Sequence, residues 1–188
     1  MRAFAAAAMI AAVVSGAAGC SAPRVQTTFL GSVDLVDMTD RMGESLTGSA
    51  AMIERSASSD PWVVSCSKVA NHTNQIIPDG EKWLYLARLR ARLAQSRLAQ
   101  ERSIIWIIPA ERWPAIAGEL GVSEEPYGLR LPPTHVLTAE FHALTNTSGQ
   151  GRTDAYLCSY QLVALGDGAI VWEDKWEVKR AAEGRTYD

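Results

Sequence analysis

The sequence has little cysteine, with 3 residues in a chain of 188. A small disulfide scaffold needs more, and the three cysteines do not have the paired spacing of a zinc site. Positive charge is also scarce, since 18 Lys and Arg stand against 21 Asp and Glu, which gives a formal net charge of −3. A nucleic-acid-binding domain usually carries a strongly basic surface. We therefore expect no nucleic acid among the partners.

Motifs for catalysis are missing as well. The sequence contains no nucleophile elbow, phosphate-binding loop, HExxH, CxxC or dinucleotide-binding fingerprint. Its three histidines are His72, His135 and His142. His135 and His142 lie seven positions apart on one predicted strand, so they should face opposite sides of the sheet and not share a metal. These absences predict a protein that is not an enzyme and has no cofactor, metal site or small-molecule substrate.

What is present is the balance of a folded domain. Hydrophobic residues make up 47% of the chain and charged residues 21%, which excludes a disordered or fibrous protein. A chain of 188 residues fits one domain of ordinary size. We place this domain at residues 33–188.

The N-terminal segment has the features of an export signal. The apolar run 4–14 is too short to cross a bilayer, which needs about 20 residues, but suits the core of a signal peptide. The sequence at 17–20, Ala-Ala-Gly-Cys, resembles a bacterial lipobox with Ala where Leu is usual. We predict a lipoprotein signal peptide at residues 1–19, lipidation of Cys20, and a lipid-anchored tether at residues 20–32.

The residue after the cysteine bears on location. Ser21 is not the Asp that retains such lipoproteins at the inner membrane, so the sorting rule known for this class indicates the outer membrane, facing the periplasm. The alternative is an ordinary signal peptide cut near Ala18, with Cys20 left as a free thiol.

Helical periodicity recurs three times along the mature chain. Apolar residues repeat every three or four positions in residues 34–46, and a longer stretch of this kind covers residues 81–100. A third, shorter helix is expected at residues 110–120, with Gly121 as its stop.

Two short strands are expected among these helices, at residues 62–66 and 103–108. The run 103–108 carries isoleucines at both parities, so we predict a central strand with both faces buried. Cys66 and Cys158 both fall in predicted strands. They are buried free thiols or, because an extracytoplasmic setting permits it, a disulfide.

The last third of the chain changes to a period of two. Residues 135–144, 156–165 and 170–178 alternate between apolar and polar side chains, separated by a polar loop at 145–152 and a tight turn at 166–168. The fold class is therefore α/β (α+β): a single small domain whose mostly antiparallel sheet ends in a C-terminal three-stranded meander, with helices packed on it.

The final strand has two unlike faces. Ile170, Trp172 and Trp176 share a face that should pack on a helix, and the charged opposite face, with the loops, would then serve recognition. The other possibility is that the Trp pair is itself an exposed docking patch.

Several stretches together resemble the LpoB-type penicillin-binding-protein activator lipoproteins. They span about residues 33–180 and are DLVDMTDRM at 34–42 with Ser45 and Leu46, VANHT at 69–73, GRTD at 151–154, YL at 156–157, LV at 162–163 and GAIVWED at 168–174. The resemblance implies a non-catalytic α/β domain at the outer membrane. It also implies a bifunctional peptidoglycan synthase as the partner, whose activities the domain raises. An envelope structural or secretion/appendage accessory of the same fold is the alternative.

Overall fold

The computed structural model describes residues 27–94, 96–122 and 131–183. Cys20, the signal segment and the start of the predicted tether lie outside the described residues. The helices are α1 (Ser32–Gly48), α2 (Ala50–Ile53), α3 (Asp79–Ala94), α4 (Leu98–Glu101) and α5 (Trp113–Leu120). The strands are β1 (Trp62–Cys66), β2 (Ala70–His72), β3 (Ile104–Trp106), β4 (His135–Ser148), β5 (Gly151–Ala164) and β6 (Ile170–Glu183).

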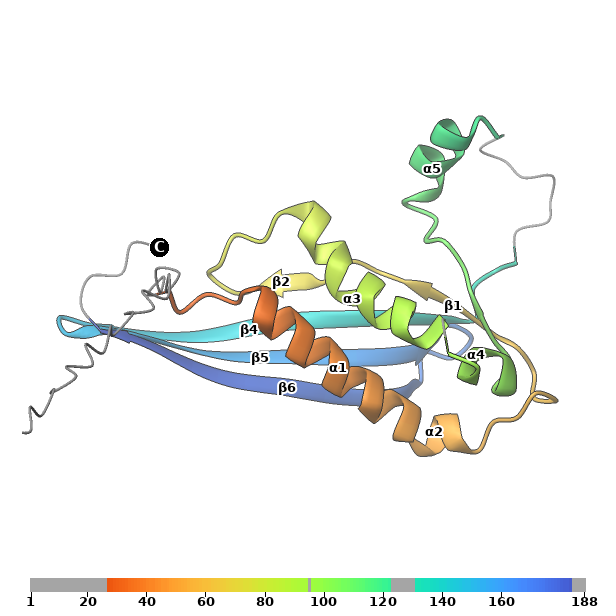
Figure 1. Ribbon diagram of the computed structural model, residues 1–188, viewed down its shortest axis with the longest axis horizontal. Coiled ribbons are helices and arrows are strands. Elements are labelled where there is room, and N and C mark those ends of the chain that lie inside the picture. Colours follow the sequence, from red (N-terminus) through yellow and green to blue (C-terminus); the bar gives the residue numbers. More distant parts are fainter. Residues whose placement is uncertain (1–26, 95, 123–130, 184–188) are drawn as a thin grey trace, which may run out of the picture.

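The strands form one mixed sheet with the order β3-β1-β4-β5-β6, and β2 pairs with β4 beside β1. The strands β1, β2 and β3 make parallel pairs, whereas β4, β5 and β6 form the predicted antiparallel meander. The helices α1 and α3 pack on each other and on the sheet, and α5 stands away from it (Figure 1). The α+β class is confirmed.

The core lies between these two helices and one face of the sheet. The predicted apolar stripes of α1 and α3 point inward, and Tyr160 of β5 donates a hydrogen bond from its hydroxyl to the sulfur of Met38, at 3.0 Å. Trp172 and Trp176 of β6 are buried in this layer, as their strand parity predicts. The fully buried side chains include Met38, Leu46, Leu86, Leu89, Leu137, Phe141, Tyr156 and Leu162.

The strands β4 and β5 are longer than predicted. Their ladder continues to the pair Ser148–Gly151, so the expected loop at 145–152 is a tight turn between two strands. The polar sequence there marks where the helices stop covering the sheet, not where backbone pairing stops. Gly151 is required by packing, because a Cβ at this position would lie 2.3 Å from the carbonyl oxygen of Ala182 on β6.

The prediction of a central buried strand at 103–108 is wrong. The strand β3 covers only Ile104–Trp106 and lies at the edge of the sheet, where it pairs with β1 alone. Ile105 is 39% exposed. The apolar run indicates a strand but does not distinguish an edge strand from a central one. Ile104 and Trp106 are only half-buried, yet their apolar sequence is the same as that of a fully buried strand.

Smaller differences have local causes. The helix expected at residues 81–100 is divided into α3 and α4. Ile170 was expected on the buried face of β6, but it is 52% exposed because the register shifts between Leu162 and Val163. The helix α5 ends at Gly121, whose φ of 64° is the left-handed cap expected from the sequence.

The edge position of β3 makes a testable prediction. Ile105→Asp should lower the free energy of unfolding by only about 1 kcal/mol, because the new carboxylate reaches water. The matched substitution Val64→Asp, on the neighbouring strand at 1% exposure, should cost several kcal/mol and prevent stable folding. Urea unfolding of both variants measures the difference. Equal damage from the two would show that β3 is covered.

Candidate functional site

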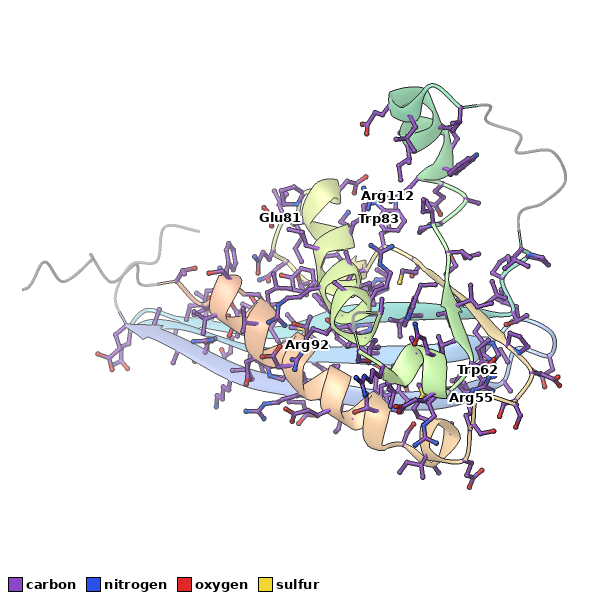
Figure 2. The ribbon with its side chains drawn as sticks, turned by 45° about the vertical axis from the view of Figure 1, so that its right-hand side comes forward. Arg55, Trp62, Glu81, Trp83, Arg92 and Arg112 are labelled. Atoms are coloured by element: carbon purple, nitrogen blue, oxygen red, sulfur yellow. The ribbon has the colours of Figure 1, made fainter. Side chains whose placement is uncertain are left out.

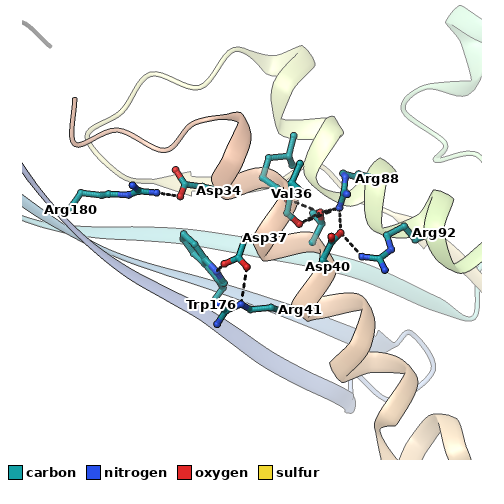
Figure 3. Close-up of polar contacts among 11 residues, drawn as sticks. Asp34, Val36, Asp37, Asp40, Arg41, Arg88, Arg92, Trp176 and Arg180 are labelled. Carbon is teal, nitrogen blue, oxygen red and sulfur yellow. Dashed lines mark hydrogen bonds and ion pairs between the residues drawn. The ribbon is translucent and has the colours of Figure 1, made fainter. Parts of the chain in front are cut away.

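The aspartates of α1 fix this helix between β6 and α3 (Figure 3). Asp34 accepts a hydrogen bond from the backbone N–H of Gly31, at 2.9 Å, and pairs with Arg180 of β6. Asp37 accepts a hydrogen bond from the indole Nε1 of Trp176, at 2.8 Å, which is the main cause of a lowered pKa of Asp37. These contacts therefore position α1 on the sheet.

The third aspartate of the series faces α3. Asp40 pairs with Arg88 and Arg92, and the hydrogen bond from Arg88 is the main cause of a lowered pKa of Asp40 (Figure 3). The aspartates that carry the sequence resemblance thus hold the fold together.

The chain just before α1 is also bound to the sheet. Thr28 donates a hydrogen bond from its hydroxyl to Oδ2 of Asp154, at 2.5 Å, and Thr28 is fully buried. Leu30 is buried too, and its backbone exchanges hydrogen bonds with the side-chain amide of Gln75. Thr28 and Leu30, which the sequence assigns to the tether, therefore pack on the domain near the end where β4 meets β5.

A stack of charged and aromatic side chains closes the opposite end of the sheet. Figure 2 shows Arg55 beside Trp62, and the guanidinium carbon lies 4.0 Å from the centre of the Trp62 ring. The ring centres of Trp62 and His135 lie 4.5 Å apart. Burial, and then the charge of Arg55, lower the pKa of His135. These contacts pack the three side chains against one another.

Both described cysteines are free thiols within the sheet. Cys66 and Cys158 are buried and form no disulfide. Burial raises the pKa of each thiol to about 12, so neither is a thiolate at neutral pH. They are core residues and not candidate nucleophiles.

The side of β4, β5 and β6 away from α1 and α3 is uncovered, and we call it the open face. The charged character predicted for one side of β6 is found here. Its exposed side chains are Glu140, His142, Leu144, Leu157, Glu173, Lys175, Glu177 and Lys179.

A shallow groove crosses the open face. Its volume is about 640 Å³, and it is lined by His72, His142, Leu144, Leu157, Glu177 and Lys179, among others. Leu144 is 80% exposed and Leu157 is 37% exposed. Apolar side chains rimmed by charges are typical of a surface that a partner covers.

A cluster of two histidines and a glutamate at the groove was not predicted from the histidine spacing. The parallel pairing of β2 with β4 sets His72 directly beside His142, and their rings stack with centres 4.9 Å apart. Glu140 lies two residues before His142 on the same face, and its Oε2 is 3.5 Å from Nε2 of His142. His135 lies on the opposite face of β4, as its spacing predicts.

No family model matches the sequence, and no curated protein matches it. Among solved structures, the chain is similar to the LpoB C-terminal domain from Escherichia coli, with 18% identity over 77% of this chain and 98% of that chain and a TM-score of 0.47. The LpoB C-terminal domain from Salmonella enterica is similar at 16% identity over the same shares, with a TM-score of 0.45. Lipoprotein GNA1162 from Neisseria meningitidis is similar at 14% identity, 64% and 84% coverage, and a TM-score of 0.39. The first two of these structures are LpoB domains, from the family whose motifs this sequence resembles.

The buried carboxylate Asp154 makes the stability of this domain depend on pH. Burial raises its pKa, but hydrogen bonds from Thr145, Thr28 and Arg152 outweigh burial, so the pKa of Asp154 lies below its ordinary value. The stabilisation of the folded domain by the ionised Asp154 is therefore fully present above about pH 3.9, the usual Asp pKa. This stabilisation is lost as the pH falls through the lowered pKa.

We expect Asp154→Asn to lower the free energy of unfolding by about 1–3 kcal/mol at pH 7, because charged hydrogen bonds are lost. The difference from wild type should shrink as the pH falls below about 4 and through the lowered pKa, where the wild-type carboxylate also becomes neutral. Thermal melts between pH 7 and pH 2.5 measure this, with Glu119→Gln on exposed α5 as the control. A difference that stays constant with pH would contradict the role given to the charge.

Proposed function

We propose that this protein is an outer-membrane lipoprotein without catalytic activity that binds and activates a bifunctional peptidoglycan synthase, a penicillin-binding protein. The observation that carries the proposal is the open face of the sheet, with its shallow groove and exposed leucines. A surface of this kind suits a macromolecular partner better than a small substrate, which is usually enclosed. The lipobox-like sequence and the family resemblance supply the location and the kind of partner.

The anchor in this proposal is Cys20. Two or three acyl chains hold a protein on a membrane firmly, since each buried methylene contributes about 0.8 kcal/mol. None of the helices among the described residues is long and apolar enough to cross a membrane. Lipid at Cys20 is the proposed means of attachment.

The anchor sets the orientation of the domain. Eight residues lead from Cys20 to Thr28, which spans about 28 Å when fully extended. Because Thr28 is bound to Asp154 near the β4–β5 turn, this end of the sheet should face the membrane. The end with β3 and α5 then projects into the periplasm. The open face is then oriented roughly perpendicular to the membrane.

Lipidation is tested by metabolic labelling with a palmitate analogue. The wild-type chain should be labelled and should fractionate with the outer membrane. Cys20→Ala should lose the label, because the thiol is the acceptor in this class of lipoprotein. Labelling that survives Cys20→Ala would refute the anchor and leave the ordinary cleaved signal peptide.

The partner is tested by recovery from solubilised envelopes with the full-length chain as bait. We expect a penicillin-binding protein to be recovered with the wild type and lost with the double variant Leu144→Glu and Leu157→Glu, which places charge in the groove. Leu165→Glu, at a leucine of similar exposure (49%) in the β5–β6 turn, is the matched control.

Consistent absence of a penicillin-binding protein from the wild-type recovery would refute the proposed partner. Unchanged recovery with the double variant would show that the partner binds outside the open face, and the proposed function would still hold.

A second function is favoured by the short distance between anchor and domain. A reach of about 28 Å keeps the domain close to its own membrane, which suits an envelope structural, secretion or appendage accessory. Recovery of an outer-membrane export or appendage component in the same experiment would select this alternative.

A further inference from the structure

We propose that His72, His142 and Glu140 form a binding site for a divalent transition-metal ion such as Zn²⁺ on the open face. The ligand atoms of these three side chains all lie within 4.8 Å of one another. Two imidazole nitrogens and one carboxylate oxygen are a ligand set that zinc uses in proteins. The proposal does not depend on the identity of the protein partner.

The distances are close to those that a bound ion needs. With zinc–nitrogen distances of about 2.0 Å and tetrahedral geometry, neighbouring ligand atoms lie about 3.3 Å apart. The contact between Glu140 and His142 is already at 3.5 Å. The rings of His72 and His142 are stacked, so both must rotate to point a nitrogen at one ion. All three side chains are exposed, so this rotation leaves the core in place.

The backbone under the site is well held. The strand β2 is in register with β4, with His72 opposite His142. Within β2, Asn71 donates a hydrogen bond from its amide to the carbonyl oxygen of Gln75, at 2.8 Å. After β2, Asn74 donates one to the hydroxyl of Thr145, at 2.7 Å. The ligands are therefore placed by two paired strands and a fixed turn, so binding needs little ordering of the backbone.

Three protein ligands leave one coordination position of a tetrahedral ion for water or for a donor atom from another molecule. His72 and His142 also line the groove, so that position opens onto the surface described above. The structure thus assigns to this face a site that can hold a metal and accept a further ligand.

The test is an isothermal calorimetric titration, in which ZnCl₂ is added to the tag-free, full-length chain in mild detergent. We expect one ion per chain, and binding at least about tenfold weaker in His72→Ala, His142→Ala and Glu140→Gln. The control is Glu173→Gln, an exposed carboxylate elsewhere on the open face, which should bind as the wild type does.

The histidine ring signals in an NMR spectrum give an independent measurement, because the chain has only three histidines. Zn²⁺ should shift the signals of His72 and His142 and leave those of buried His135 in place. The absence of binding by the wild type, or shifts of all three histidines alike, would overturn the proposal. Unchanged affinity in the three ligand variants would do the same.

Discussion

The packing of α1 against β6 is the interaction on which the rest of the structure depends. The first helix of the domain lies on its last strand, and the indole of Trp176 donates to Asp37 while Arg180 pairs with Asp34. On the other side of α1, Asp40 holds α3 through two arginines. Helix and strand thus bury the tryptophans of β6, and the helix layer that results covers one face of the sheet alone.

That one-sided cover decides where function can lie. The thiols of Cys66 and Cys158 and the imidazole of His135 are all taken into packed regions, where burial disfavours their charged forms. The open face, by contrast, leaves the leucines of the groove and the histidine pair accessible. The proposed partner contact and the proposed metal site both use this surface.

The sequence predicts the parts of this fold that have a clear period. The stripe of α1, the meander and the inward tryptophans follow from spacings of three, four and two. The edge position of β3 could not be predicted, since an apolar run does not reveal how many neighbours a strand has. The His72–His142 pair could not be predicted for another reason. The strand β2 is only three residues long and has no period, and His72 pairs with a residue 70 positions further along the chain. Cys20 lies outside the described residues, so its lipidation stays a prediction.

The closure of α1 on β6 also has a kinetic consequence. Asp37 and Trp176 are 139 positions apart, and Thr28 and Asp154 are 126 apart. Contacts between such distant segments form late, because the loop they close is costly in entropy. The N-terminal helix cannot find its place until the final strand is present. A chain that crosses a membrane with its N-terminus first would therefore remain unfolded throughout the passage, and its stable structure would form only on the far side.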